Sequence, residues 1–131
     1  MDESRLQSLR PFEGLTTAER RTLARMLDEF SAPAGTTLVE QGDYGYEFMI
    51  IEQGTVDVLC DGERIDSMGS GEFFGELAVL QAGGQRNATI VATSDVRLLT
   101  LTAHYLRVVR DTMPLVAQRI DDVTAKRRHL L

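Results

Sequence analysis

Hydrophobic positions near the start of the chain recur with the period of an α-helix. Within TTAERRTLARMLDEF, residues 16–30, the apolar side chains have the i, i+3, i+4, i+7 spacing of one helix face: Leu23, Met26, Leu27 and Phe30. Thr16 and Glu19 have the spacing of a capping box, which marks a helix start. Pro33, in the following SAPAG, disfavours continuation of the helix. The pattern predicts N-terminal helices within residues 1–31, including an earlier short helix broken at Pro11.

The period changes to that of β-strands in the middle of the chain. The segment EFMIIEQGTVDVLC, residues 47–60, predicts two strands that meet near Gln53-Gly54. The Asp61-Gly62 pair that follows is a strong signal for a hairpin turn. Further strands are predicted within 87–93 and 96–102. Short strands separated by close turns favour an antiparallel roll, barrel or sandwich.

The helical period returns in the last part of the chain. Pro114 separates two predicted helices, because proline is well tolerated at a helix start. The second helix has an apolar stripe formed by Val116, Ile120 and Val123. These side chains are candidates for contacts of a lid or of a dimer, and ordinary packing on the strands is an equal alternative.

Basic residues gather in the later turns of that last helix, namely Arg119, Lys126, Arg127 and Arg128. Positive charge at a helix C-terminus interacts favourably with the helix dipole. The cluster is therefore interpreted as a capped and solvated helix end, with a nucleic-acid or lipid patch as the alternative.

Composition and charge narrow the function classes. The chain has 131 residues, 43% hydrophobic and 26% charged, which fits one globular domain over residues 1–131. The net charge of −6 argues against a nucleic-acid-binding surface, which is usually basic. The single cysteine, Cys60, has apolar neighbours and is expected to be a buried small hydrophobe. The sequence shows neither a signal peptide nor an apolar run of membrane-spanning length, so we expect a cytoplasmic protein without membrane insertion.

The stretch GEFFGELAVLQAGGQRNATIVA, residues 71–92, carries the candidate chemistry. Gly75 precedes a predicted short helix, and the first amides of a helix lack internal partners and favour an anion. Gly75, Leu77 and Ala78 are thus candidate backbone donors. Glu76 only accepts hydrogen bonds, so it must face a different part of the ligand, such as a sugar hydroxyl.

Arg86 supplies a full positive charge ten residues after Glu76. Its planar guanidinium matches two phosphate oxygens, and the intervening GGQ, residues 83–85, lets the chain turn back toward the helix start. The small Ala88 leaves room for a close amide contact. Glu76 and Arg86 alternatively form a surface ion pair of little energetic value. Their spacing alone leaves both interpretations open.

These residues resemble a known family. The motif Phe74-Gly75-Glu76-Leu77, followed by Arg86, Ala88, Thr89 and Ile90, is similar to the phosphate-binding cassette of cyclic nucleotide-binding domains. The similarity extends upstream and covers nearly the whole chain. Its upstream positions are Gly35, Leu38, Gly42, Asp43, Gly45, Phe48, Ile50, Gly54 and Val56.

The resemblance implies a fold that is mainly β, an eight-stranded antiparallel β-roll (jelly-roll-like) with N-terminal helices and two C-terminal helices. The implied organisation is N-terminal helices in 1–31, the roll in 35–101 with the cassette at 74–90, and C-terminal helices in 102–129. In the family, the last helix often closes over the base and passes on the binding signal.

The resemblance also implies a role for each site residue. Arg86 binds the cyclic phosphate, Glu76 accepts from the ribose 2′-hydroxyl, and Asn87 lies near the base. Backbone amides near Gly75, Leu77, Ala78 and Ala88 complete the site. Cyclic GMP-selective members often carry threonine at the Asn87 position, and Tyr46 replaces a residue that is small or acidic in many members.

The expected function is a non-catalytic regulatory module that binds a cyclic nucleotide, cAMP rather than cGMP. The alternative is an interaction domain of the same fold that binds another effector or none. A metal-dependent enzyme is disfavoured, because metal sites need clustered ligands and the two histidines, His104 and His129, lie far apart. We expect no cofactor, no metal and no DNA binding, since no room remains for a helix-turn-helix. A homodimer or an effector protein is expected to contact the C-terminal helices.

Overall fold

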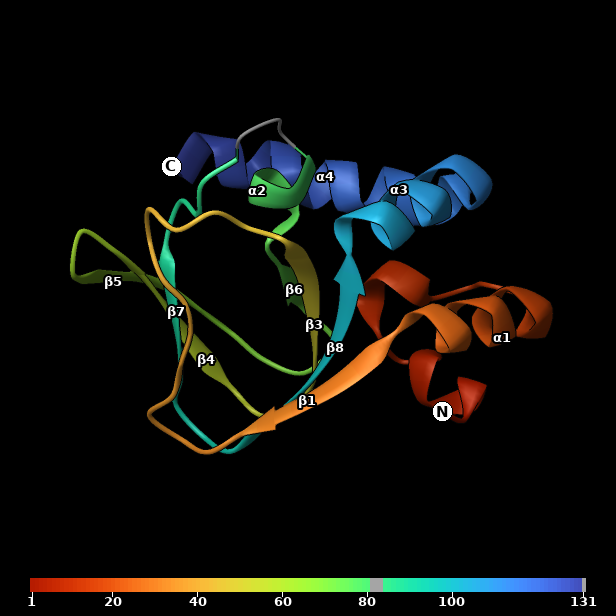
Figure 1. The fold of residues 1–131 in the computed structure, drawn as a ribbon, viewed down its shortest axis with the longest axis horizontal. Coiled ribbons are helices and arrows are strands. Elements are labelled where there is room, and N and C mark those ends of the chain that lie inside the picture. The colour runs from red at the N-terminus through yellow and green to blue at the C-terminus, as the bar shows by residue number, and fades with distance from the viewer. Residues whose placement is uncertain (81–83, 131) are drawn as a thin grey trace.

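A computed structural model describes residues 1–80 and 84–130 (Figure 1). The N-terminal part consists of the 3₁₀ helices η1 (Glu3–Leu6) and η2 (Arg10–Phe12) and the helix α1 (Thr17–Met26). The strands are β1 (Asp28–Ala32), β2 (Thr37–Val39), β3 (Glu47–Gln53), β4 (Val56–Cys60), β5 (Glu63–Met68), β6 (Phe73–Phe74), β7 (Thr89–Ala92) and β8 (Val96–Thr102). The short helix α2 (Glu76–Leu80) lies between β6 and β7, and α3 (Ala103–Thr112) and α4 (Pro114–Leu130) follow β8.

The strands form two four-stranded antiparallel sheets. Their orders are β1-β8-β3-β6 and β2-β7-β4-β5. Consecutive strands often lie in different sheets, so the chain passes repeatedly from one side of the roll to the other, as Figure 1 shows. The predicted class, eight antiparallel strands in a roll with flanking helices, is confirmed for the described residues.

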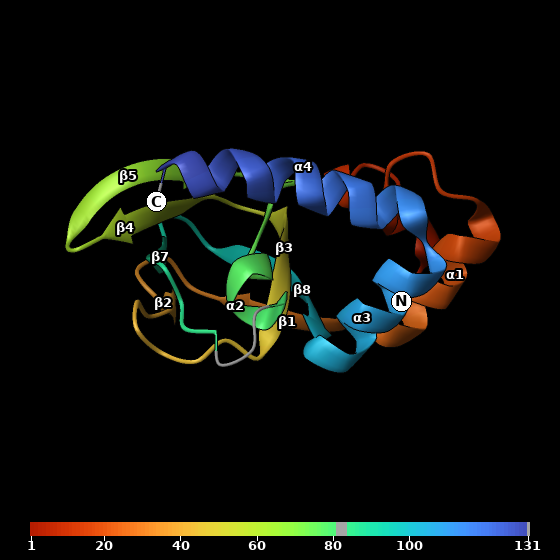
Figure 2. The same cartoon turned by 90° about the horizontal axis from the view of Figure 1, so that it is seen from above.

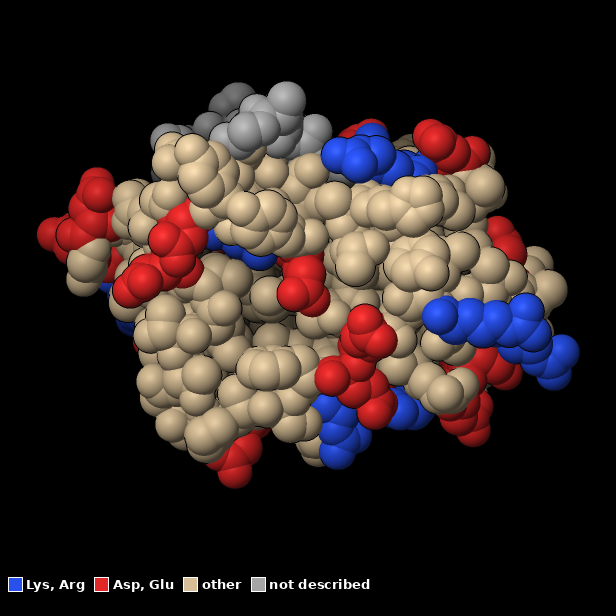
Figure 3. Space-filling model, viewed as in Figure 1, with Lys and Arg blue, Asp and Glu red and all other residues tan. Residues whose placement is uncertain are grey.

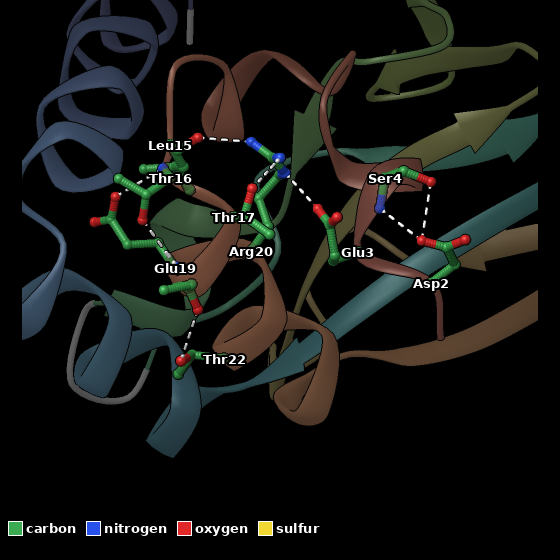
Figure 4. A network of polar contacts seen from close by, with 10 residues as sticks. Asp2, Glu3, Ser4, Leu15, Thr16, Thr17, Glu19, Arg20 and Thr22 are labelled. Carbon is green, nitrogen blue, oxygen red and sulfur yellow. Dashed lines mark hydrogen bonds and ion pairs between the residues drawn. The ribbon is translucent and has the colours of Figure 1, made fainter.

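The start of α1 has the predicted capping box (Figure 4). The Thr16 hydroxyl accepts from the Glu19 amide at 3.1 Å, and the Glu19 carboxylate accepts from the Thr16 amide at 3.0 Å. Arg20 joins the helix to the preceding segment by donating to the Glu3 carboxylate and the Leu15 carbonyl, both at 2.6 Å. Two backbone donors at the helix start are thereby satisfied locally.

The end of α1 differs from the prediction. The helix ends at Met26, and the residues from Asp28 onward form β1. Phe30, expected on the apolar helix face, pairs with Leu98 of β8 and has half of its surface exposed. Residues 28–30 gain backbone hydrogen bonds by pairing with β8, and this gain outweighs their helical spacing, because helix propensity over three residues is a weak preference.

The predicted turns of the roll are found. Asp61 and Gly62 both have positive φ, 52° and 83°, as a two-residue type I′ hairpin between β4 and β5 requires. Gly54 makes the predicted turn between β3 and β4, which takes the chain from one sheet to the other. Cys60, expected to be buried, is only half-buried at the end of β4.

The two C-terminal helices cover one side of the molecule. Val116 and Ile120 of α4 are fully buried, and Val123 packs against the same core cluster, which includes Phe48 and Leu106. The apolar stripe of α4 is thus ordinary packing within the domain. Figure 2 shows α4 extending along the molecule from α3 toward the β4–β5 hairpin. The side chains of Arg128 and His129 lie outside the described part.

Strand β5 is the edge of its sheet and, within the described residues, pairs only with β4. Its first five residues are exposed, and Met68 at its end is buried. On the face shown in Figure 3, basic side chains are scattered in separate groups rather than gathered in one patch. Among the described residues, no helix is long and apolar enough to cross a membrane.

Candidate functional site

The seven residues singled out in the sequence lie around one cavity of about 640 Å³, measured with its open mouth. They are Gly75, Glu76, Leu77, Ala78, Arg86, Asn87 and Ala88. The opposite wall comes from β4 and β5 and is largely apolar, with Val58, Ile65 and Met68. Among the α4 residues whose side chains are described, Arg127 also lines the cavity.

Gly75 makes the turn between β6 and α2 with a φ of 94°, a conformation that other residues adopt only with strain. A Cβ atom at this position would lie 2.5 Å from the Nη1 atom of Arg86 and 2.9 Å from the Glu47 carbonyl oxygen. Glycine is thus required both by the backbone and by the close approach of the guanidinium.

Arg86 is fixed from both its backbone and its side chain. Its amide donates to the Asp43 carbonyl at 2.6 Å, and its carbonyl accepts from the Gly42 amide at 2.9 Å. The guanidinium donates to the Glu47 carbonyl at 2.9 Å and to the Gly75 carbonyl at 3.4 Å. The loop before β3 and the start of α2 therefore position this side chain.

The charge of Arg86 is buried without a carboxylate partner in the described part of the chain. The residue is 8% exposed, and it belongs to none of the ion pairs found there. Burial lowers the pKa of Arg86, and the charges of Glu47 and Glu76 oppose this shift only in part. A buried cation held by neutral carbonyls alone is a favourable position for an anion.

Glu76 is buried as well, with 1% of its surface exposed. Both carboxylate oxygens accept from the Nη1 atom of Arg127, at 2.7 and 2.8 Å. The other terminal nitrogen of Arg127 donates to the Phe73 carbonyl and lies 3.2 Å from the Met68 sulfur. The guanidinium also stands over the Phe73 ring, 5.1 Å from its centroid. Thus Glu76 is anchored to α4.

The ion pair considered between Glu76 and Arg86 is not formed. Glu76 pairs with Arg127 instead, so the carboxylate and the Arg86 guanidinium are separate features of one cavity. Sequence reasoning missed Arg127, which it assigned to a solvated helix end. The sequence signal that could have found it is the position of Glu76 in an apolar stretch, because a buried carboxylate needs a basic partner. The basic cluster of α4, however, offered several candidates for that partner.

The remaining predicted residues contribute no charge. Ala78 is buried, Leu77 and Ala88 are half-buried, and Asn87 is exposed at the edge of the cavity. The turn back from α2 to Arg86 was expected at 83–85. Gly83 lies outside the described residues, whereas the Gly84 carbonyl accepts from the Gly45 amide at 3.2 Å. Whether these groups bind a ligand stays a prediction.

The arrangement is suited to binding an anion with an apolar body. It offers a fixed cation, a buried acceptor and an apolar wall. Within 1–80 and 84–130, no group of three or more histidine, cysteine or acidic side chains is placed to hold a metal ion. His104 does not line the cavity, and the side chain of His129 lies outside the described part.

Comparisons with known proteins agree with this geometry. The family model described as "Cyclic nucleotide-binding domain" matches residues 29–112. The cAMP-dependent protein kinase regulatory subunit of Colletotrichum orbiculare is 38% identical over 103 residues, 77% of this chain and 26% of that protein. The chain thus spans about a quarter of the length of this relative.

Two solved structures show the same fold. The catabolite activator protein of Thermus thermophilus is 30% identical, with a TM-score of 0.79 over 91% of this chain and 58% of that one. The cAMP-bound PfPKA-R is 22% identical, with a TM-score of 0.86 over 98% of this chain and 44% of that one. These relatives are named as regulatory or activator proteins, and the domain is a binding module rather than an enzyme. The chain belongs to the cyclic nucleotide-binding domain family.

Proposed function

We propose that this domain is a regulatory sensor whose ligand is cAMP, in preference to cGMP, bound in the cavity between α2, β5 and α4. The observation that carries the proposal is the buried Arg86 guanidinium, which has no carboxylate partner in the described structure. An anion at this position supplies the missing opposite charge. The cyclic phosphate of the nucleotide is that anion.

Each part of the nucleotide has a matching region in the cavity. Arg86 receives the phosphate, with the turn at Gly75 beside it. Glu76 accepts a hydrogen bond from the ribose 2′-hydroxyl, because an ionised carboxylate is an acceptor only. The apolar wall of Val58, Ile65 and Met68 is left for the base.

The preference for cAMP rests on two observations. Asn87, at the edge of the cavity, replaces the threonine that is frequent in cGMP-selective members of the family. The relative with 38% identity is named for its cAMP dependence.

Calorimetry of the purified chain with cAMP, cGMP and 5′-AMP tests the proposal. We expect cAMP to bind most tightly. Arg86→Ala removes charge-assisted hydrogen bonds of about 1.5–3 kcal/mol each, so cAMP affinity falls at least about tenfold. Arg86→Lys also weakens binding, because the planar fork is lost. The matched control is Arg21→Ala, at an exposed position of α1. Unchanged cAMP affinity in Arg86→Ala would reject the site.

The sugar contact has its own test. With the wild-type chain, 2′-deoxy-cAMP should bind more weakly than cAMP, because the buried Glu76 carboxylate loses a donor. Equal affinities for the two nucleotides contradict the assignment of Glu76 to the hydroxyl while leaving the phosphate site intact.

The regulatory step is a population shift in which the nucleotide favours one placement of the C-terminal helices on the roll. The contact of α2 with α4 through Glu76 and Arg127 provides the physical link. A homodimer or an effector protein at these helices, and a cytoplasmic location, remain expectations from the sequence. A pull-down that retains the same partners with and without cAMP would argue against nucleotide control.

A further inference from the structure

We propose that a second cavity, formed by β2, β3 and the segment that joins them, binds an arginine side chain of a partner protein. The cavity measures about 420 Å³ with its open mouth. Its lining shares Val39 and Arg86 with the first cavity, whereas its other described residues differ from those of the first. The proposed nucleotide function leaves this surface unused, and its occupation by a partner does not depend on that function.

Two tyrosines that line this cavity are turned to solvent. Tyr44 is 58% exposed and Tyr46 is 72% exposed, the highest values among the large hydrophobic side chains described. The local reason is the glycine between them. A Cβ atom at Gly45 would lie 2.5 Å from the Cβ of Ala78 and 2.9 Å from the guanidinium carbon of Arg86, so this position points inward. Successive side chains of an extended segment point to opposite sides, so both tyrosines point outward.

The backbone that carries the two rings is fixed from two sides. Tyr44 forms an antiparallel bridge with Gln85, and the Tyr46 carbonyl accepts from the Ala103 amide at 3.2 Å. Because this backbone is already ordered, binding through the rings costs little conformational entropy. Tyr46 also stands where many members of the family carry a small or acidic residue, so its ring is not a general feature of the fold. Large rings that are held in water by an ordered backbone are typical of an interaction surface.

The charge of the cavity selects the chemistry of the partner. Its lining contains three exposed carboxylates, and none of them belongs to an ion pair found within 1–80 and 84–130: Glu40, Asp43 and Glu47. Arg86 adds one positive charge, so three negative charges and one positive charge give a net −2. On the face shown in Figure 3, acidic side chains stand on two sides of a hollow. In the described part of the chain these carboxylates are not grouped closely enough to hold a metal ion, so we expect an organic cation.

An arginine side chain matches each kind of surface in this cavity. Its guanidinium stacks on aromatic rings and pairs with carboxylates through a planar fork, which the compact ammonium of lysine does not provide. Its aliphatic stem needs an apolar surface, and the half-buried side chains of Leu38, Val39 and Met49 supply one. The net charge of −6 also favours the approach of a basic segment. The occupant is therefore an arginine-containing segment of a partner protein.

NMR spectroscopy of the isotopically labelled domain with short peptides tests the proposal. The probe is a capped peptide of alternating glycine and arginine, and matched peptides carry lysine or citrulline in place of arginine. We expect the arginine peptide to move the amide signals of residues 40–47 most. The lysine peptide should bind about two- to fivefold more weakly, because the stacked fork is lost. The citrulline peptide, which keeps the shape without the charge, should move none of these signals.

One pair of variants tests the rings. Tyr46→Ser should weaken binding of the arginine peptide about three- to tenfold, through loss of a cation–π contact. The matched control is Phe30→Ser, which removes a half-exposed ring from β1 and should change the affinity by less than about twofold. Circular dichroism checks that both variants are folded.

A second pair of variants separates the local carboxylates from the overall charge. Glu40→Gln combined with Glu47→Gln removes two negative charges from the cavity and should weaken binding at least about threefold. Asp28→Asn combined with Glu63→Gln removes the same charge at exposed positions elsewhere and should change it by less than about twofold.

Four results would overturn the proposal. Equal losses in the two double variants would mean that the peptide follows only the overall negative charge. A lysine peptide that binds as tightly as the arginine peptide would refute the choice of arginine. The largest signal changes outside residues 40–47, or none at millimolar peptide, would refute the location. Dimerisation of the free domain in sedimentation experiments, abolished by Tyr46→Ser, would mean that a second copy of this chain occupies the cavity instead.

Discussion

Replacing Arg86 by methionine should make the ligand-free domain more stable while weakening nucleotide binding. The guanidinium is 8% exposed and is held by two backbone carbonyls rather than by a carboxylate. Burial lowers the pKa of Arg86, which means that the folded protein disfavours the charged form relative to the unfolded chain. A site that awaits an anion therefore reduces the stability of the free protein.

The magnitude follows from the contacts that change. Taking a charge out of water costs several kcal/mol, and the two hydrogen bonds to carbonyls return about 1.5–3 kcal/mol each. In Arg86→Met the Gly75 carbonyl still accepts from the Val79 amide at 3.2 Å, so the Glu47 carbonyl is the main group that loses a donor. Methionine fills a similar volume with apolar atoms. We expect the free energy of unfolding to rise by about 1–2 kcal/mol, near the low end of such replacements.

Urea unfolding followed by circular dichroism measures this difference on the ligand-free proteins. A gain of about 1–2 kcal/mol corresponds to a Tm increase of roughly 3–8 °C in a domain of this size. Arg21→Met, at an exposed position, is the control and should lie within about 0.5 kcal/mol of wild type. A ligand-free Arg86→Met protein that is less stable than wild type would refute the argument that this charge is uncompensated. A Tm increase on addition of cAMP that equals that of wild type would refute the part of the prediction that concerns nucleotide binding.

Three further outcomes are expected. The hydrogen bond from Arg5 lowers the pKa of the Glu52 carboxyl below its ordinary value of 4.5. The stabilisation of the folded state by this contact is therefore present above that pH and is lost as the pH falls through the lowered value. Glu52→Gln should flatten the stability–pH curve between about pH 5 and pH 3, in acid titrations followed by circular dichroism. Ile120→Ala should cost about 2–5 kcal/mol in urea unfolding, because the side chain is fully buried, whereas Leu115→Ala at a 40% exposed position of the same helix should cost less than about 1 kcal/mol. Gly54→Ala should lower stability by about 1–3 kcal/mol, because φ is 101° and the new Cβ would lie 2.4 Å from a carbonyl oxygen in the turn before β8; a Tm within one degree of wild type contradicts this.

Sequence patterns correctly predicted the turns and helix starts whose backbone conformation is set by a few neighbouring residues. The capping box at Thr16, the hairpin at Asp61-Gly62 and the helix start at Pro114 each involve residues that fix their own backbone or cap it. The end of α1 was misplaced, because Phe30 continues the helical pattern but pairs with a strand 68 positions further along the chain, at Leu98. Such a long-range pairing has no local signal.

The sequence predicted the cassette residues of the site, but it did not predict the contact between Glu76 and α4. The order of Gly75, Glu76 and Arg86 identified the family, and the structure brings all three to one cavity. The partner of Glu76 lies 51 positions away on α4, among several basic residues with the same local pattern. Only the packing of α4 on the core decides which of them reaches the carboxylate.

The exposed edge strand β5 has a consequence for the behaviour of the protein at high concentration. An unpaired strand edge offers free amides and carbonyls to the strand of a second molecule, and charged side chains along it oppose that association. Glu63, Arg64 and Asp66 lie there, next to the exposed Ile65. These charges oppose the pairing of β5 with a strand of a second molecule. A variant that neutralises all three should aggregate at protein concentrations at which the wild-type protein does not.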